Sequence, residues 1–240
     1  MDRPIGVFDS GIGGLNVLSK CASLLPRESF IYLADYASMP YGEKSEDEIK
    51  LAAVRNAERL VDMNCKAVVA ACNTATALGI AEIRRLYPDI ITLGLEPAVK
   101  PCVSELVCGY AVALVTPATA KSHRFNELMD KYGGSVIAVP CAGLAKSIED
   151  NIFDLEKIRS MVYGTLSGYR GAKAVVLGCS HYSYITDIIK DFYGGGVKIY
   201  DGVDGLALNL VNSLNSSGLN SNACERTIRF YSTKRLNRRQ

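Results

Sequence analysis

The sequence has little excess of either charge and no long hydrophobic run. Its 240 residues include 27 Lys and Arg and 25 Asp and Glu, a formal net charge of +2. Proteins that bind mainly nucleic acid or a membrane surface usually carry a strong basic excess, so we expect neither as the main partner. No apolar run approaches the roughly 20 residues of a membrane span, and the first residues do not resemble a signal peptide. We therefore expect a cytoplasmic protein. The one basic cluster is a C-terminal tail, which we interpret as a solvated terminus: Lys234, Arg235, Arg238 and Arg239.

Common metal and nucleotide motifs are missing as well. The eight cysteines include no Cys-x-x-Cys, so neither a zinc ribbon nor a thioredoxin-type site is supported. The glycine-rich segment after Asp9 has Asn16 where a dinucleotide fingerprint needs its third glycine, and Gly-Lys-Ser/Thr is absent. Cys179 and His181 have no second pair at metal-ligand spacing. We therefore expect no metal and no nucleotide cofactor.

Composition and hydrophobic pattern indicate an ordinary globular α/β protein. Hydrophobic residues make up 48% and charged residues 22% of the chain. Short apolar runs predict buried strands at residues 5–8, 30–34, 67–71 and 92–95. The clearest helical pattern lies between two of them, at 45–63, where Ser45 and Glu48 form a capping box. Alternating strands and helices predict a parallel sheet.

The second half repeats this rhythm. It predicts strands at 110–115, 135–139, 174–177 and 198–200, with helices starting near Ala120, Leu144 and Leu155. One offset of 107 residues carries Ala67–Asn73 onto Ala174–Ser180 and Asp9 onto Thr116. The same offset carries the loop 40–42 onto 147–149. Because it matches strand ends, where α/β sheets place their chemistry, we interpret the chain as two pseudo-symmetric α/β lobes with the active site in the cleft between them.

The lobes are not expected to divide the chain into two continuous pieces. After residue 202 the sequence predicts a helix at about 205–214, a Ser/Asn-rich loop and an edge strand at 227–232. A segment that follows the second lobe often packs back on the first. We therefore expect residues 1–97 with 206–240 to form the first lobe, and 98–205 the second.

Cys72 and Cys179 occupy equivalent strand ends of the two halves and so would face each other across the cleft. Each precedes polar residues, Asn73-Thr74 and Ser180-His181, that can donate hydrogen bonds to an anion. The following helix would add its N-terminal amides. We expect this environment to favour thiolate over thiol.

Asp9 and the two histidines are the next candidates. Asp9 ends the first strand, and it is either a cap of the following helix or a carboxylate that orients an amino group or relays a proton beside Cys72. His181 is placed to change the acidity of Cys179. His123, with Lys121, Ser122 and Arg124 around it, is expected to be an ordinary exposed residue.

Four motifs in series carry a family resemblance: Asp9-Ser10-Gly-x-Gly-Gly-Leu15, Pro40-Tyr41-Gly42, Ala71-Cys72-Asn73-Thr74-Ala75 and Gly178-Cys179-Ser180-His181-Tyr182. In this order the chain resembles the cofactor-independent glutamate racemases from about residue 5 to residue 232. The turn from Thr116 to Thr119 and Glu149 also fall where that family has polar cleft residues. The sequence departs from the family at Ser180, usually Thr, at 183–185, usually Pro-Leu-Leu, and in a shorter C-terminal end.

The resemblance implies racemisation of L- and D-glutamate without a cofactor, which supplies D-glutamate for peptidoglycan precursors. Inverting Cα requires a thiolate and a thiol on opposite faces of that carbon. By resemblance, Cys72 acts on the D-isomer with Asp9 assisting, and Cys179 acts on the L-isomer with His181 assisting. Glu149 would lie near the substrate ammonium or His181. The implied substrate contacts are Asp9, Ser10, Pro40, Tyr41, Gly42, Asn73, Thr74, Thr116, Thr119, Ser180 and His181. We expect a small-molecule substrate and a homodimer.

Other functions remain open from the sequence. A related racemase acting on aspartate or another amino acid is the nearest, but the aspartate branch typically has an acidic residue where His181 stands. A decarboxylase on the same lobes usually keeps one of the two cysteines, whereas both are present here. A thiol redox protein would need the two sulfurs closer than a substrate cleft permits. A non-catalytic binding protein is disfavoured by the intact polar motifs around both thiols.

Overall fold

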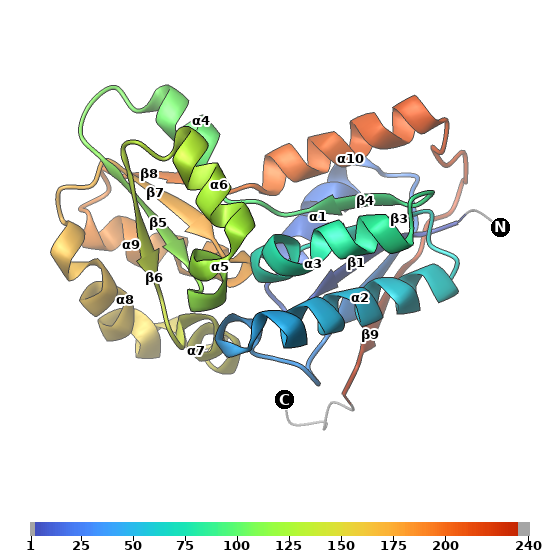
Figure 1. Cartoon of the computed structure of the whole chain (residues 1–240), viewed down its shortest axis with the longest axis horizontal. Coiled ribbons are helices and arrows are strands. Elements are labelled where there is room, and N and C mark those ends of the chain that lie inside the picture. Colours follow the sequence, from blue (N-terminus) through green and yellow to red (C-terminus); the bar gives the residue numbers. More distant parts are fainter. Residues whose placement is uncertain (1–2, 235–240) are drawn as a thin grey trace.

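Two parallel β-sheets form the framework of the molecule (Figure 1). The computed structural model describes residues 3–234. The first sheet has the strand order β4-β3-β1-β2-β9, and all its strand pairs are parallel. Its strands are β1 (Ile5–Asp9), β2 (Phe30–Ala34), β3 (Ala67–Ala70), β4 (Ile91–Gly94) and β9 (Ile228–Ser232). We refer to each sheet with its helices as a lobe.

The second sheet repeats the topology of the first. Its order is β6-β5-β7-β8, again with parallel pairs throughout. Its strands are β5 (Ala111–Val115), β6 (Val136–Pro140), β7 (Ala174–Gly178) and β8 (Lys198–Tyr200). The order β4-β3-β1-β2 in one lobe corresponds to β8-β7-β5-β6 in the other. The predicted α/β class and the repeated strand pattern are therefore confirmed.

Helices cover both faces of each sheet. On the first sheet, α1 (Leu15–Leu24) and α10 (Val203–Ser217) pack on one face, and α2 (Glu46–Asp62) and α3 (Asn73–Leu86) pack on the other. On the second sheet, one face carries α7 (Leu144–Asp150), α8 (Arg159–Leu166) and α9 (Thr186–Phe192), and the other carries α4 (Val99–Glu105) and α6 (His123–Tyr132). The short elements are α5 (Pro117–Lys121) and the 3-10 turns η1 (Tyr41–Glu43), η2 (Leu155–Ile158), η3 (Ser167–Tyr169) and η4 (Ser180–Ile185).

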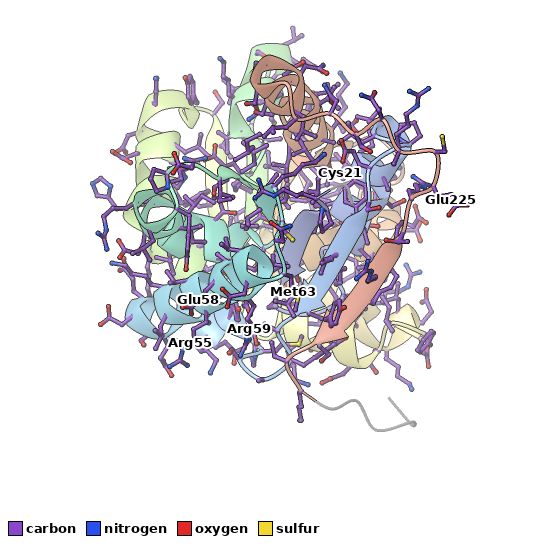
Figure 2. All side chains as sticks on the ribbon, turned by 90° about the vertical axis from the view of Figure 1, so that its right-hand side faces the viewer. Cys21, Arg55, Glu58, Arg59, Met63 and Glu225 are labelled. Atoms are coloured by element: carbon purple, nitrogen blue, oxygen red, sulfur yellow. The ribbon has the colours of Figure 1, made fainter. Side chains whose placement is uncertain are left out.

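The helix α2 shows how the sequence sets these elements. Ser45 accepts a hydrogen bond from the Glu48 amide, and the Glu48 side chain accepts one from the Ser45 amide, so the predicted capping box is present. Figure 2 shows Arg55, Glu58 and Arg59 on the solvent side of this helix. Its apolar side packs into the core of the first lobe.

One predicted helix is divided in two. The single helix expected from about Ala120 is the pair α5 and α6, because Ser122 has an extended backbone and caps α6 by accepting from the Phe125 amide. Thr116 caps α5 in the same way, by accepting from the Thr119 amide. Two N-caps six residues apart leave room for only a short first helix.

The C-terminal segment returns to the first lobe. α10 packs beside α1, and β9 pairs in parallel with β2, with Ile228 opposite Phe30. A buried ion pair holds the segment that connects α10 to β9. Lys66 Nζ lies 2.7 Å from Glu28 Oε2 and also donates a hydrogen bond to the Leu219 carbonyl in that segment. Of the predicted basic tail, Arg235, Arg238 and Arg239 lie outside the described residues. None of the helices within residues 3–234 is both long and apolar enough to cross a membrane.

Candidate active site

The carboxyl ends of the two sheets face each other, and we call the space between them the cleft. Asp9 ends β1, while Cys72, Thr116 and Cys179 follow β3, β5 and β7. All four residues are buried. Ser180 Oγ of the second lobe donates a hydrogen bond of 2.9 Å to Asp9 Oδ1 of the first. The fold therefore brings these strand ends together across the two lobes.

Cys72 occupies the N-cap position of α3. The backbone amides of Thr74 and Ala75 hydrogen bond to its sulfur, which favours the thiolate. Burial outweighs them and raises the pKa of the Cys72 thiol, and the nearby Asp9 and Cys179 raise it further. The expectation that this position favours thiolate is therefore wrong for Cys72 in the substrate-free protein, where the neutral thiol is preferred.

Cys179 has an imidazole beside it. Its Sγ lies 3.9 Å from Nδ1 of His181, and Nε2 of the same ring donates a hydrogen bond of 2.7 Å to Oε2 of Glu149. Burial alone lowers the pKa of His181, but the hydrogen bonds with Cys179 and Glu149 outweigh it and raise the pKa to about 10. The ring is therefore an imidazolium at neutral pH. His181 lies in the 3-10 turn η4, which directly follows Cys179. The sequence predicted an α-helix at this point.

Glu149 links this imidazolium to the other lobe. Its Oε1 accepts a hydrogen bond of 2.7 Å from the Tyr36 hydroxyl, and its Oε2 accepts one of 3.0 Å from the Ile12 amide. Burial raises the pKa of Glu149, but the hydrogen bonds from His181 and Tyr36 outweigh it and leave the pKa lowered. Of the two positions that the resemblance allowed for Glu149, the structure places it at His181.

Further contacts join the lobes beside the cleft. Tyr184 donates a hydrogen bond of 3.0 Å to the Ile12 carbonyl, and Asn16 donates one of 3.0 Å to the Ser183 hydroxyl. Ser183 and Tyr184 lie within 183–185, where the sequence differs from the Pro-Leu-Leu that the resemblance implies. Sequence reasoning missed them and also missed Tyr36, although Tyr36 follows β2 at the same sheet edge as Asp9.

Asp9 holds the glycine-rich loop and does not cap a helix. α1 begins at Leu15 with Gly14 as its N-cap, which leaves Asp9 outside it. Asp9 Oδ2 accepts from the Gly11 amide at 3.1 Å and from the Ser10 hydroxyl at 3.5 Å. Burial raises its pKa, against the opposing effects of His181, Gly11 and Ser180. Of the two sequence interpretations, the one that places a carboxylate in the cleft fits the structure.

The loop Pro40-Tyr41-Gly42 faces the second lobe with its backbone, because the Tyr41 side chain is buried in the first lobe. The Tyr41 hydroxyl donates a hydrogen bond of 2.6 Å to Asp35 Oδ2. Gly42 lies against Thr116 of the second lobe so closely that a Cβ at Gly42 would meet the Thr116 Cβ at 2.8 Å. A small cavity of about 10 Å³ lies between this loop and the second lobe, room for about one water molecule. The lobes are therefore closed on each other at this loop.

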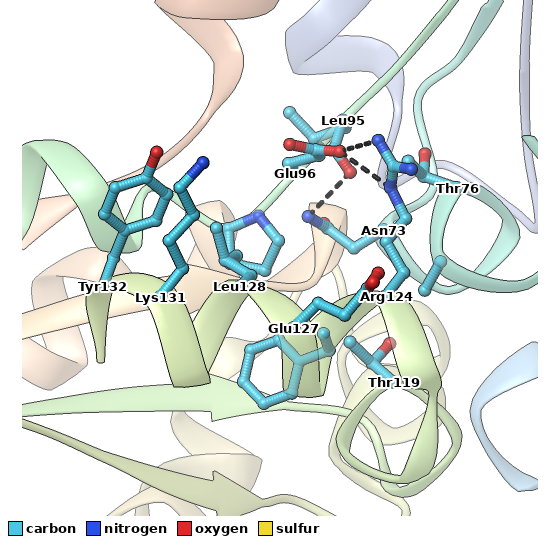
Figure 3. A pocket seen from close by; sticks show the side chains of 13 residues that line it. Asn73, Thr76, Leu95, Glu96, Thr119, Arg124, Glu127, Leu128, Lys131 and Tyr132 are labelled. Carbon is cyan, nitrogen blue, oxygen red and sulfur yellow. Dashed lines mark hydrogen bonds and ion pairs between the residues drawn. The ribbon is translucent and has the colours of Figure 1, made fainter. Parts of the chain in front are cut away.

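Three hydroxyls form a buried cluster that joins the two lobes. Thr74 Oγ1 lies 2.9 Å from Thr116 Oγ1 and 3.1 Å from Thr119 Oγ1. The Asn73 Nδ2 donates to the Leu95 carbonyl at 3.2 Å, and its Oδ1 is buried with no hydrogen-bond partner among residues 3–234. Figure 3 shows Asn73 and Thr119 lining a pocket of about 310 Å³ between α3 and α6.

The remaining candidates are accounted for simply. His123 is exposed and lies 3.3 Å from Glu127, one helical turn away. All eight cysteines are free. Within residues 3–234 no group of three or more His, Cys, Asp or Glu side chains is arranged to hold a metal ion.

Comparison with known proteins identifies the family of this chain. A profile described as Asp/Glu/Hydantoin racemase matches residues 5–209. The chain belongs to this racemase family. The glutamate racemase of Clostridium perfringens strain SM101 is 39% identical over 224 residues, which cover 92% of this chain and 86% of that one. The chain therefore spans most of the length of this relative.

Solved structures of this racemase family have the same fold. A glutamate racemase isoform from Bacillus anthracis matches with a TM-score of 0.85 and 28% identity, covering 98% of this chain and 90% of that one. The glutamate racemase of Francisella tularensis, solved in complex with D-glutamate, matches with a TM-score of 0.84 and 30% identity, covering 98% and 89%. The two-lobed α/β architecture predicted from the sequence is thus the architecture of the racemase family.

Proposed function

We propose that this member of the racemase family is a glutamate racemase that interconverts L- and D-glutamate with two thiols and no cofactor. The observation that carries the proposal is the placement of Cys72 and Cys179 after equivalent strands of two facing sheets. Each thiol has its own proton-handling neighbour: Asp9 near Cys72, and His181 at Cys179. Relatives named glutamate racemase at 39% identity support the choice of substrate.

The two thiols would take opposite parts in the L-to-D reaction. His181 Nδ1 lies 3.9 Å from Cys179 Sγ, and this sulfur would act as the base that takes the Cα proton of L-glutamate. Burial keeps Cys72 as a thiol, which is suited to deliver its proton to the opposite face. One Cα–H bond breaks as the Cys179 S–H bond forms, and the Cys72 S–H bond breaks as the new Cα–H bond forms. The D-to-L direction starts from the opposite pair of protonation states.

The difficult step is the acidity of Cα, because a free amino acid has no imine to accept the electron pair. The cleft must therefore stabilise a carbanion-like, dianionic species with fixed hydrogen-bond donors and little water. We assign this task to polar groups around the two thiols: Ser10, Asn73, Thr74, Thr116, Thr119, Ser180 and the backbone at Pro40, Tyr41 and Gly42. Asp9 would orient the substrate ammonium or relay a proton at Cys72, and Glu149 would hold His181.

The closed cleft implies that the lobes separate to admit the substrate and close again around it. Contacts that cross the cleft, such as Ser180 to Asp9, are the ones that would break and reform. We therefore expect D-glutamate to lower hydrogen exchange at the lobe boundary. Equal exchange with and without D-glutamate would oppose this part of the proposal.

The wider role follows from the family resemblance. We propose that the protein works in the cytoplasm as a homodimer and supplies D-glutamate for peptidoglycan precursors. We also propose the division into a first lobe of residues 1–97 with 206–240 and a second lobe of 98–205. The packing of α10 on α1 and the pairing of β9 with β2 support that division.

The test is incubation of the purified protein with L-glutamate in deuterated water without added cofactor, following optical rotation and Cα deuterium. Inversion with deuterium uptake that is lost in Cys72→Ala and Cys179→Ala is the expected result. Cys102→Ala is the matched control, because this thiol is buried in the second lobe's core. Absence of both inversion and exchange with glutamate would refute the proposal, and aspartate would then be tested in the same assay. Inactivity toward both would favour a binding or redox role.

A further inference from the structure

Glu149 is held from both lobes at once. His181, from its own lobe, and the Ile12 amide, from the other, both donate to Oε2. The Tyr36 hydroxyl donates a hydrogen bond of 2.7 Å to Oε1, and Tyr36 lies in the loop after β2 in the other lobe. Both carboxylate oxygens therefore have donors, and two of the three donors reach Glu149 only when the lobes are closed.

The direction of the Glu149 carboxylate decides where the imidazole of His181 lies. The ring has one nitrogen on Glu149 at 2.7 Å and the other facing Cys179 Sγ at 3.9 Å. A carboxylate that loses its donor on Oε1 can rotate, and the ring that hydrogen bonds to Oε2 then moves with it. Groups that support a reacting residue in this way affect rate through small displacements.

We propose that Tyr36 is a positioning residue for proton transfer at Cys179: its hydroxyl fixes the Glu149 carboxylate that orients His181 when the lobes close. This inference rests on the proposed racemase function and on the roles given there to Cys179 and His181. It adds that one side of a two-sided reaction depends on a residue of the opposite lobe. The hydrogen bonds to the Cys72 sulfur come from the first turn of α3, and Asp9 and Cys179 lie nearby, so we expect Cys72 to depend less on Tyr36.

The contribution of the hydroxyl can be separated from that of the ring. Tyr36→Phe removes one hydrogen bond to a charged acceptor and keeps the aromatic ring. Loss of such a bond predicts a fall in kcat on the order of tenfold. Tyr184→Phe is the matched control, because the Tyr184 hydroxyl also bridges the lobes, at 3.0 Å, but donates to the Ile12 carbonyl and not to Glu149.

Rates alone do not reveal which thiol is affected. L- and D-glutamate are enantiomers of equal free energy, so kcat/KM must remain equal in the two directions for every variant. Primary deuterium isotope effects do distinguish the two thiols. If proton removal by Cys179 slows, the isotope effect on kcat/KM rises with [2-²H]-L-glutamate and falls toward one with [2-²H]-D-glutamate.

A second readout needs no turnover. The chain has two histidines, and His123 is exposed, so ¹⁵N-histidine NMR gives two easily distinguished imidazoles. We expect Tyr36→Phe to shift the Nε2 resonance of His181, whereas Tyr184→Phe leaves it in place. Thermal unfolding of both variants checks that the fold is kept.

We expect Tyr36→Phe and Glu149→Gln each to show two changes: opposite changes in the isotope effects of the two enantiomers, and a shifted Nε2 resonance of His181. We expect neither change in Tyr184→Phe. If Glu149→Gln shows the asymmetry and folded Tyr36→Phe does not, the inference is overturned while the racemase proposal stands. Equal changes in Tyr36→Phe and Tyr184→Phe would also overturn it, because a general loosening of the lobes would explain both. If the parent protein does not racemise glutamate, the proposed function itself has failed.

Discussion

Gly13 lies in the glycine-rich loop of the first lobe, directly against the second thiol's neighbours. A Cβ at this position would lie 2.5 Å from His181 Nδ1 and 2.5 Å from Ser180 Oγ. Neither atom is free to retreat, because Ser180 is hydrogen bonded to Asp9 and His181 to Glu149. Gly13→Ala therefore places a methyl wedge between the lobes at the cleft.

The size of the effect follows from the distance. An ordinary contact begins at 3.4 Å, so atoms at 2.5 Å must separate by about 0.9 Å. A misplacement of about 1 Å in a catalytic constellation can cost about 100-fold in rate, or about 2.7 kcal/mol. Gly13 does not have a positive φ, so alanine fits its backbone and the first lobe should keep its stability.

The assay is racemisation followed by circular dichroism, with thermal unfolding measured on the same samples. We expect kcat/KM of Gly13→Ala to fall about 100-fold with little change in the melting temperature. Gly134→Ala is the control, because nothing lies within 4 Å of a Cβ there. A Gly13→Ala protein with kcat/KM within about twofold of the parent would show that the cleft tolerates this wedge, and the closed geometry would not be the reactive one.

Three further predictions concern the support of the site. Lys66→Met leaves the Glu28 carboxylate buried without its cation, so we expect a loss of about 3–5 kcal/mol of unfolding free energy in urea titrations. Thr233→Val removes the 2.6 Å hydrogen bond to Asp35, the carboxylate that holds the loop Pro40-Tyr41-Gly42, so on the proposed function KM should rise up to about tenfold with kcat little changed. Because folding raises the pKa of His181 to about 10, its charged form stabilises the protein fully below its unfolded pKa of about 6.5, and this stability is lost as pH rises through about 10. The melting temperatures of parent and His181→Asn should therefore converge at high pH, and a constant difference would contradict the assigned charge.

Much of the fold could be predicted because its signals are local. The strands are short apolar runs, and α2 has its capping box in the sequence. The offset of 107 residues also holds in space, because β3 and β7 occupy the same place in their sheets. The helix expected from Ala120 was less predictable: the hydroxyl of Ser122 can continue a helix or cap a new one, and the extended backbone there decides for the cap.

The residues of the candidate site that follow strand ends could be predicted from the sequence. The contacts that form only between the closed lobes could not. Cys72, Asp9 and His181 all lie where polar residues after strands should lie. The contact of Tyr36 with Glu149 joins residues 113 positions apart, and no local pattern encodes it. The prediction that Cys72 favours the thiolate was wrong for a related reason. The sequence shows its neighbours, but burial, which dominates its pKa, depends on how the lobes pack.

The duplicated lobes give the two thiols equal positions but unequal surroundings. The repeat that pairs Cys72 with Cys179 also pairs Asp9 with Thr116, so the carboxylate near Cys72 has no counterpart in the second lobe. On the other side, His181 brings a positive charge to Cys179. A symmetric site would give both sulfurs the same charged neighbours. The proposed reaction uses one thiol as base and the other as acid, and the departure from symmetry around the repeated cysteines gives the two sulfurs the different neighbours that such a division of roles needs.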